Sequence, residues 1–360
     1  MNDRVGCGGG SQILIQVKKL FLGLIIVLLV AAEAAYLVFG PATSFQGPKY
    51  DLYIHSGATY ETLMNGLRQN GVINHPAVFN WLARRSGYPE KIKAGKYEIR
   101  SGMSLFHLLK MLRNGRQTPV NLVITKLRTK EDLAGLIGRK LECDSASFLS
   151  YLNNNDTLRH YALDSNTVMT AVLPNTYTYF WNTNPTRIFR KMEMANRAYW
   201  TTARKQQAEA HKLNPVTAYI LASIVEEETT RKEDKPKIAS VYLNRLETGM
   251  KLAADPTVKF ALRDFELKRV YSKYLSVESP YNTYRNSGLP PGPICTPSME
   301  SLDAVLNAPE TKYLYFVARP DFSGYSNFAE SYPEHLQNAR LYQKSLDEQM
   351  KIGRQSKANP

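Results

Sequence analysis

An uncharged apolar run near the N-terminus constrains this chain more than any other feature. The run LFLGLIIVLLVAA occupies Leu20–Ala32, Glu33 interrupts it, and AAYLVFG extends it to Gly40. A helix needs roughly twenty such residues to cross the hydrocarbon core of a bilayer. Glu33 lies in the last third of the run, where its carboxylate can reach an interface. We therefore predict a single transmembrane helix at residues 20–40.

The charges around the run predict its orientation. Three cations precede it: Arg4, Lys18 and Lys19. No charge follows Glu33 until Lys49. Because Lys and Arg gather on the cytoplasmic side, residues 1–19 are predicted to be a cytoplasmic tail and the remainder to lie outside the membrane. The alternative is a cleaved signal peptide, whose apolar core is shorter; Ala31–Ala35 is a poor match to its cleavage site.

The basic excess of the chain fits a partner outside the cytoplasm. Lys and Arg number 46 against 32 Asp and Glu, a net charge of +14, and the 43% hydrophobic content excludes wholesale disorder. Such an excess suits a nucleic acid, an anionic membrane surface or an acidic polymer. Because the basic part of the chain is predicted to be exported, no nucleic-acid partner is expected.

Cysteine and histidine usage excludes two further classes of protein. Three cysteines in 360 residues do not make a disulfide scaffold. Cys7 is predicted to be cytoplasmic, whereas Cys143 and Cys295 either pair or remain free buried thiols. The six histidines are scattered, and neither H-E-x-x-H nor C-x-x-C occurs. We therefore expect no metal site and no cofactor.

Two stretches of the exported part share one pattern. Leu52–Leu82 and Leu122–Leu152 each open with a short apolar alternation, continue with a capping threonine, Thr59 or Thr129, and then suggest two helices. After the first copy, AGKYEI predicts a strand, and SLFHLLKMLRNG predicts a helix that Ser104 caps and Gly115 ends. Residues 50–117 are thus predicted to form a small strand-helix-helix-strand-helix domain.

The remaining exported chain predicts a mixture of helices and strands. Residues 185–212 suggest one long polar helix, and YLYFVA at Tyr313–Ala318 suggests a buried strand. The C-terminal residues 348–360 are predicted to be a flexible tail.

One helix carries the most informative residues. Asn214 and Pro215 form a helix start, and VTAYILASIVEEETT follows. At 100° per residue, Glu228 falls near the centre of the apolar face, Glu227 on its edge and Glu226 opposite. Burial raises the pKa of a carboxyl group, and a protonated acid is what cleavage of a glycosidic bond requires. The alternative is that the helix frays before Glu228 and leaves all three acids in solvent.

A second helix and a long loop follow. The helix is PKIASVYLNRLETG, which Gly249 ends, and ADPTV comes after it. Ser279–Ser298 contains too much Pro and Gly for a helix or a central strand, and long ordered loops are usually functional. Aromatic faces beside amide and hydroxyl groups suit a sugar. The candidate sugar-binding residues of this region are Tyr281, Asn282, Thr283, Tyr284 and Asp255, the last of which would otherwise cap a turn.

These motifs, taken in order, resemble the YceG-like family of endolytic murein transglycosylases. EEET, ASVYLNRL, DPTV, YNTY, GLPPGPI, TP and YLYFVA occur in the family's order over roughly residues 165–345, and residues 50–117 resemble the family's LysM-like domain more loosely. The resemblance implies that Glu228, the second Glu of E-x-E-T, is the catalytic acid and base, with Glu226 beside the substrate. It also implies a YceG-like transglycosylase domain at residues 118–347.

Two departures from the family pattern stand out. The family often has Asp where this chain has Asn175, so a carboxylate is missing there. The lysine common within E-x-E-T is Glu227 here, and we expect its side chain to point away from the site.

The resemblance implies a lyase reaction on peptidoglycan. Cleavage of the MurNAc–GlcNAc β-1,4 bond of nascent strands would leave 1,6-anhydroMurNAc ends and terminate strand elongation. Because no water enters that reaction, one committed acid suffices. The alternatives are an inverting hydrolase that uses Glu228 with Asp255 and a non-catalytic, membrane-anchored peptidoglycan-binding protein.

The expected architecture and location follow from both lines of reasoning. The fold class is α+β, with a single N-terminal transmembrane helix, a small LysM-like α/β domain and a mixed α+β catalytic domain. The protein is expected in the bacterial inner membrane as a single-pass protein with its catalytic domain outside the cytoplasm. Expected partners are peptidoglycan glycan strands, the membrane and, by the resemblance, peptidoglycan synthases.

Overall fold

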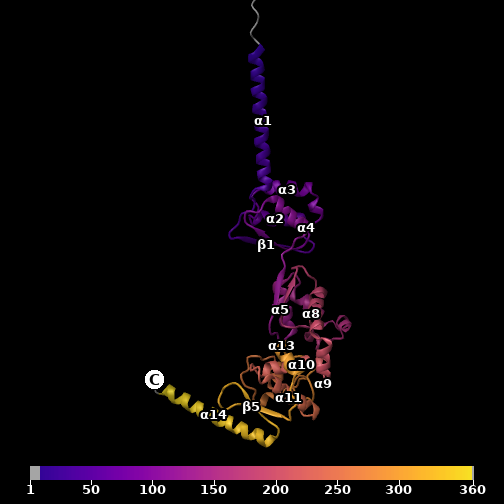
Figure 1. The fold of residues 1–360 in the computed structure, drawn as a ribbon, viewed down its shortest axis with the longest axis vertical. Coiled ribbons are helices and arrows are strands. Elements are labelled where there is room, and N and C mark those ends of the chain that lie inside the picture. The colour runs from indigo at the N-terminus through magenta and orange to yellow at the C-terminus, as the bar shows by residue number, and fades with distance from the viewer. Residues whose placement is uncertain (1–8, 359–360) are drawn as a thin grey trace, which may run out of the picture. The chain divides into compact units, whose positions relative to one another are not determined.

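The fold is a mixture of helices and short strands in two compact units. The computed structural model describes residues 9–358 and the side chains of Leu14–Lys351, so the expectations for Arg4 and Cys7 lie outside the described residues. One unit comprises Met1–Val120 with Phe180–Asn182, and the other comprises Asn121–Tyr179 with Thr183–Pro360. The described strands form three two-stranded sheets, so the predicted α+β class is confirmed (Figure 1).

The first unit begins with the predicted apolar helix. Helix α1 runs over Gly9–Phe39, and within its segment Leu14–Phe39 a window of 18 residues has a mean hydropathy of 2.5 with none of the window buried. The end of α1 packs against the rest of the unit, where the Phe39 ring lies 5.2 Å from the Phe106 ring. Length and composition fit either a membrane anchor or a signal sequence.

The remainder of the first unit has the predicted element order. Its elements are β1 (Lys49–Ile54), α2 (Tyr60–Gln69), α3 (Pro76–Arg85), β2 (Gly95–Arg100) and α4 (Leu105–Asn114), with a short 3-10 turn, η1, at Tyr88–Glu90. β1 pairs with β2 in antiparallel register, and the helices bury an apolar core against them. Thr59 and Ser104 cap their helices as predicted, and Gly115 ends α4 at a positive φ of 68°.

The second unit opens with the other copy of the pattern. Its elements are β3 (Val120–Ile124), α5 (Lys130–Lys140) and α6 (Ser145–Asn153), and the predicted cap Thr129 forms a capping box with Asp132. Short turns follow at α7 (Asn155–Leu158), η2 (Arg159–Tyr161) and η3 (Val168–Ala171) before β4 (Asn175–Tyr179), which pairs with β3.

The predicted single helix at 185–212 is wrong, because two helices occupy that stretch. α8 covers Pro185–Tyr199 and α9 covers Thr202–Ala210. Trp200 is buried at the break, and the Thr201 hydroxyl accepts a hydrogen bond from the Arg204 amide and so caps α9. Burial of the indole and the new cap compensate for the interrupted helix.

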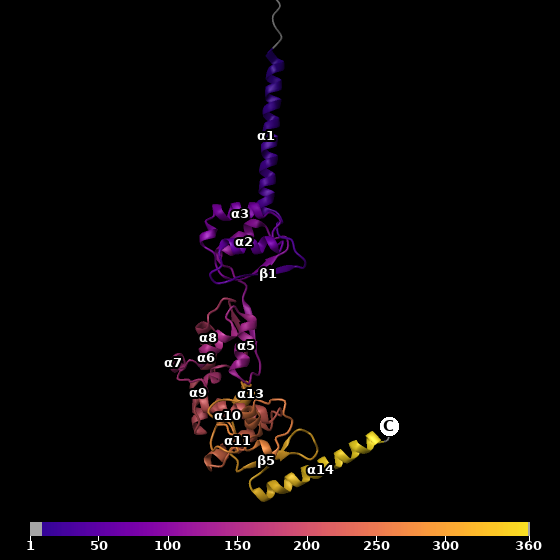
Figure 2. The same ribbon diagram turned by 180° about the vertical axis from the view of Figure 1, so that it is seen from behind.

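Four helices form the centre of the second unit. α10 (Pro215–Glu228) packs against α11 (Lys235–Glu247), α12 (Asp255–Leu262) and α13 (Met299–Leu306), and both views show α10, α11 and α13 together (Figures 1 and 2). Every residue from Ala218 to Val225 is buried. α10 is therefore a central helix without a solvent face, which differs from the amphipathic helix that the sequence predicted.

The C-terminal elements also differ from expectation. β5 (Tyr315–Ala318) pairs antiparallel with β6 (Ser326–Ala329), but β5 is only half-buried and starts later than the predicted buried strand. Between α12 and α13 the described chain contains one short turn, η4 (Ser272–Tyr274), and then the predicted long loop. α14 covers Tyr332–Ala358, so most of the predicted flexible tail continues a helix.

Candidate active site

The candidate site lies where α10 ends. Asn214 caps the first turn and forms a reciprocal capping box with Thr217, while Pro215 occupies the first helical position. These signals set the start of the helix, and its last residue is Glu228, after which Thr229 is extended with φ of −149°. The three acids Glu226, Glu227 and Glu228 therefore all belong to the last turn, which excludes the alternative that the helix frays before Glu228.

Glu228 is a half-buried acid held by a tyrosine. The hydroxyl of Tyr242 on α11 donates a hydrogen bond of 2.5 Å to its Oε1. Burial raises the pKa of Glu228 to about 7, and the negative charge of Asp255 adds to the rise. The hydrogen bond from Tyr242 and the charges of Arg245 and Lys259 oppose the rise without cancelling it. Near neutral pH this carboxyl can therefore both donate and accept a proton.

Tyr242 was missed by the sequence reasoning. Its side chain is 1% exposed, and its ring packs edge-on against Phe316 with 6.0 Å between centroids. A buried tyrosine normally finds a hydrogen-bond partner for its hydroxyl, and this residue lies inside the ASVYLNRL motif. A tyrosine within this motif was the signal in the sequence. That its hydroxyl would bond to Glu228 could not be predicted, because the contact depends on the packing of α10 on α11.

Asp255 and Tyr284 lie together, as two predicted site residues should. Asp255 is the first residue of α12 and is exposed, and the Tyr284 hydroxyl donates a hydrogen bond of 2.7 Å to its Oδ1. The charge of Asp255 raises the pKa of Glu228, and the charge of Glu228 in turn raises the pKa of Tyr284. The carboxylate also sits in the first turn of α12, where the helix dipole favours a negative charge.

The other predicted loop residues have different environments. Asn282 is fully buried; its amide donates to the Leu275 and Val277 carbonyls at 2.9 and 2.8 Å. Thr283 is 1% exposed, and its hydroxyl accepts a hydrogen bond from the Ala254 amide at 3.0 Å. In this structure neither side chain reaches the surface, so a direct contact with a sugar would require the loop to rearrange.

The Tyr281 ring packs against α12. Its ring lies 4.6 Å from the ring of Phe260, and it is half-buried. Burial raises the pKa of its hydroxyl, so the group stays a neutral donor at physiological pH.

Glu226 is not on a solvent face, contrary to the helical-wheel expectation. Its Oε2 accepts hydrogen bonds from the hydroxyls of Ser298 at 2.6 Å and Ser301 at 2.5 Å, and Lys235 Nζ lies 3.3 Å away. Burial alone would raise the pKa of Glu226, but these serine hydrogen bonds and the Lys235 charge outweigh it and lower the pKa. Glu226 is therefore an ionised carboxylate that fastens α10 to α13.

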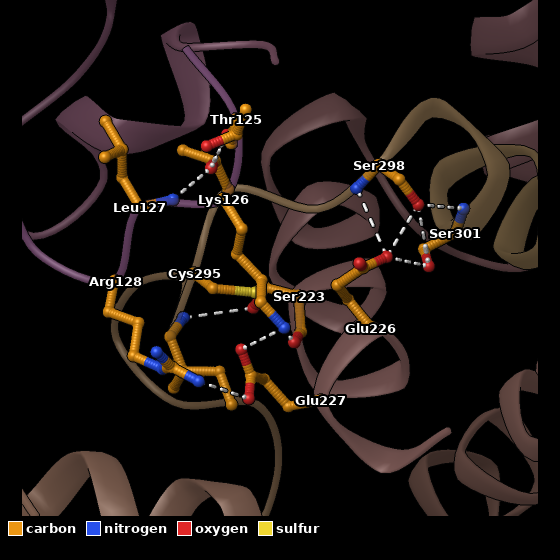
Figure 3. A network of polar contacts seen from close by, with 12 residues as sticks. Thr125, Lys126, Leu127, Arg128, Ser223, Glu226, Glu227, Cys295, Ser298 and Ser301 are labelled. Carbon is orange, nitrogen blue, oxygen red and sulfur yellow. Dashed lines mark hydrogen bonds and ion pairs between the residues drawn. The ribbon is translucent and has the colours of Figure 1, made fainter. Parts of the chain in front are cut away.

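Glu227, whose side chain was expected to point away from the site, lies between two cations. Lys126 Nζ lies 3.1 Å from its Oε1 and Arg128 Nη2 lies 3.3 Å from its Oε2. Figure 3 shows Glu226 and Glu227 pointing in different directions, one toward the serines of α13 and the other toward the chain before α5. The three neighbouring acids thus have three different sets of partners.

The two described cysteines do not pair. Cys143 and Cys295 are both free, and Cys295 is buried beside Ser223 of α10. Burial raises the pKa of the Cys295 thiol well above its usual value, so it remains protonated and unreactive. Within residues 9–358, no group of three or more His, Cys, Asp or Glu side chains is arranged to hold a metal ion.

Glu228 is partly protonated near neutral pH and lies at the end of a buried helix, with an exposed aspartate and two tyrosines around it. This arrangement is typical of a general acid–base site, here in an α+β domain. The chain belongs to the YceG-like family, which matches residues 52–341.

Comparisons with individual proteins agree with this family. The endolytic murein transglycosylase of Bacillus subtilis (strain 168) is 30% identical over 314 residues, which cover 83% of this chain and 86% of that protein. The endolytic murein transglycosylase of Streptococcus pneumoniae (serotype 2, strain D39) is 25% identical over 299 residues. That match covers 74% of this chain but only 53% of the pneumococcal protein, so the chain spans about half of that relative.

A solved structure has the same fold. A YceG-like protein of Listeria monocytogenes superposes with a TM-score of 0.53 at 27% sequence identity, covering 81% of this chain and 98% of the Listeria chain.

Proposed function

We propose that this protein is an endolytic peptidoglycan lytic transglycosylase that uses Glu228 as its acid and base. The observation that carries the proposal is the place of Glu228 at the end of the buried helix α10, where Tyr242 donates to its Oε1 at 2.5 Å and burial raises its pKa to about 7. The family and the named relatives supply the substrate class, a murein glycan strand. Catalysis of this kind needs a group that is a proton donor in one step and a proton acceptor in the next.

The reaction balances with a single carboxyl group. The Glu228 carboxylic acid gives its proton to the oxygen that joins MurNAc C1 to GlcNAc, and the C1–O bond breaks. The Glu228 carboxylate then takes the proton of the MurNAc C6 hydroxyl as O6 bonds to C1. A 1,6-anhydro ring results, Glu228 ends protonated, and no water is consumed.

The surrounding residues divide into two roles in this proposal. Tyr281, Tyr284 and Asp255 offer a ring face, hydroxyl groups and a carboxylate to a sugar. Asn282 and Thr283 hold the loop and the start of α12 in place through their buried hydrogen bonds. Glu226 shapes the end of α10 through its contacts with α13 rather than by touching substrate.

The wider architecture is part of the same proposal. Residues 20–40 anchor the protein in the bacterial inner membrane, residues 1–19 remain in the cytoplasm, and residues 118–347 form the transglycosylase domain outside it. Residues 50–117 form a LysM-like domain, a proposal supported by their strand-helix-helix-strand-helix order. The reaction would release nascent strands near peptidoglycan synthases.

The decisive experiment is product analysis with Glu228→Gln protein. Glutamine keeps the shape of the protonated acid and removes its proton chemistry, so we expect the loss of 1,6-anhydro-ended fragments by mass spectrometry. Glu226→Gln is the matched control, with at least partial activity expected. Anhydro ends made at an undiminished rate by Glu228→Gln protein would refute the assignment.

Labelled water tests the hydrolase alternative. Asp255 is the side chain that a two-carboxylate inverting mechanism would use to activate water. Products carrying solvent oxygen at reducing ends would favour that mechanism over the lyase. Binding of strands without new ends of either kind would favour the non-catalytic binding protein.

A further inference from the structure

A small recess is lined by Glu227, the residue that precedes the proposed catalytic acid Glu228. It has a volume of about 80 Å³, and its walls include Arg128, Glu227 and, from α12, Lys259. Glu227 precedes Glu228 in the last turn of α10, and Lys259 lies one helical turn after Asp255. The Lys259 charge also lowers the pKa of Glu228, so this ammonium acts on the acid itself.

The cations at this recess outnumber the anions. Arg128 and Lys259 line the recess with two positive charges, and Glu227 lines it with one negative charge, which Arg128 and the neighbouring Lys126 already share. Lys259 is half-buried, and among the side chains of Leu14–Lys351 it has no ion pair and no side-chain hydrogen bond. An ammonium that loses water without gaining a counter-ion is unfavourable. The Lys259 ammonium is therefore available to an anionic group.

Arg128 is held so that part of its guanidinium group stays available. Its plane lies over the Phe265 ring with 5.0 Å to the centroid, and Nη2 bonds to Glu227. Within the described residues Nη2 is the only guanidinium nitrogen of Arg128 that makes a hydrogen bond. An arginine fixed in this way is suited to a planar anionic group such as a carboxylate.

We propose that Lys259 and Arg128 bind a carboxylate of the glycan substrate in this recess, next to the bond that Glu228 cleaves. The inference rests on the proposed function for its substrate class. Peptidoglycan offers two sources of this group: the lactyl carboxylate of a MurNAc without its stem peptide, and the carboxylates of the stem itself. A recess of this size admits one such group and not a whole sugar.

The recess depends on Glu227, which occupies the position where lysine is common in E-x-E-T sequences. Its carboxylate draws Lys126 and Arg128 to the end of α10 (Figure 3). Thr296 reinforces the same wall, because its hydroxyl accepts from the Leu127 amide at 2.9 Å and donates to the Thr125 carbonyl at 3.1 Å. The Arg128 side is therefore built before a substrate arrives.

The test combines chemical change of the substrate with change of the protein. Full-length Glu228→Gln protein in detergent is titrated with soluble glycan strands, either native or with their carboxylates converted to amides. Adding Lys259→Met should weaken binding of native strands about tenfold, the factor that 1.4 kcal/mol produces. Amidation should weaken binding to the parent protein by a similar factor and leave binding to Lys259→Met unchanged.

Two further variants complete the design. Arg128→Gln should show the same dependence on carboxylates, and it stands in for Lys259→Met if that variant fails to fold. Lys268→Gln, a change at an exposed lysine, should bind both kinds of strand as the parent does. Equal losses for native and amidated strands, or no loss at all, would overturn the proposal.

Strands stripped of stem peptides by an amidase separate the two sources of carboxylate. If the lactyl carboxylate is bound, Lys259→Met loses more affinity for stripped strands, in which the amidase has freed that carboxylate, than for native strands, in which the stem peptide is amide-linked to it. If the stem is bound, the loss appears only with native strands. Binding to Glu228→Gln protein needs no catalysis, so a failure of this inference is distinct from a failure of wild-type protein to produce anhydro ends.

Discussion

At the scale of single residues, three consecutive acids show how environment decides chemistry. Serine hydroxyls and a lysine keep Glu226 ionised, and two cations share Glu227. Burial raises the pKa of Glu228 even though a tyrosine hydroxyl donates to its carboxyl group. The same carboxyl group thus links two helices in Glu226, pairs with cations in Glu227 and is the candidate catalytic acid in Glu228.

Replacing Tyr242 should move the pH dependence of activity. The Tyr242 hydrogen bond favours the charged form of Glu228, so Tyr242→Phe should raise the pKa of Glu228 above about 7. Because the reaction begins from protonated Glu228, the fall in kcat at high pH should shift upward by roughly one pH unit.

Tyr199→Phe provides the control for that shift. Tyr199 donates to Asp303 at 3.0 Å on α13 and does not contact Glu228, so its removal should leave the profile in place. A Tyr242→Phe profile identical to that of the wild type would show that the hydrogen bond does not tune the acid.

The same carboxyl should make stability depend on pH. The pKa of Glu228 is about 7 when folded and near its usual 4.5 when unfolded, so the unfolded state loses its proton first as the pH rises. Wild-type protein should therefore lose stability between pH 4.5 and 7. Glu228→Gln should be more stable than wild type by about 1–3 kcal/mol at pH 8, after discounting for its remaining solvent exposure.

Thermal unfolding across pH 4 to 8 measures this effect. The advantage of Glu228→Gln should vanish near pH 4, where both states of the wild type carry the proton. Glu247→Gln changes an exposed acid paired with Lys212, and should give no gain at pH 8. An advantage of Glu228→Gln that stays constant with pH would contradict a raised pKa.

At the scale of elements, α10 shows what the sequence could and could not predict. Its start and the place of Glu228 on the apolar side were predictable, because caps and apolar residues act locally. Its end at Glu228 was not, because the sequence left open whether the helix frays before that residue. The position of Glu226 was not, because a helical wheel assumes one buried face and α13 covers the other. Ser298 and Ser301 lie more than seventy residues away, and no local pattern links them to Glu226.

Removing Lys235 should weaken the junction of α10, α11 and α13. Its ammonium is 6% exposed and lies 3.3 Å from Glu226 and 3.1 Å from Glu300. Lys235→Ala leaves a partly buried carboxylate without its counter-ion, so we expect a loss of about 2–4 kcal/mol in the free energy of unfolding.

Urea denaturation of Lys235→Ala beside Lys212→Ala tests that estimate. The Lys212–Glu247 pair is 78% and 62% exposed, and such pairs contribute at most about 1 kcal/mol. Similar losses for the two variants would mean that the Glu226 cluster does not hold the helices together.

At the scale of the whole molecule, motif order predicted more than any single element. The strand-helix-helix pattern of both copies is confirmed, and so are the irregular loop at Ser279–Ser298 and the family. The break at Trp200 and the inward turn of Asn282 were not predictable, because each depends on packing against distant residues. Local signals therefore specify the elements, and long-range contacts specify which polar side chains face a substrate.

The N-terminal apolar helix is expected to anchor the chain in the membrane. The apolar segment Leu14–Phe39 exceeds the length that a bilayer core requires, and Ala31–Ala35 matches a cleavage site poorly. The protein should therefore keep its N-terminus and stay in the membrane fraction after alkaline carbonate extraction. In spheroplasts treated with protease, an N-terminal epitope should survive on a short fragment while a C-terminal epitope disappears, because Lys18 and Lys19 hold the tail inside. A soluble chain beginning after Ala31–Ala35 would instead establish a cleaved signal peptide, and survival of the C-terminal epitope alone would establish the opposite orientation.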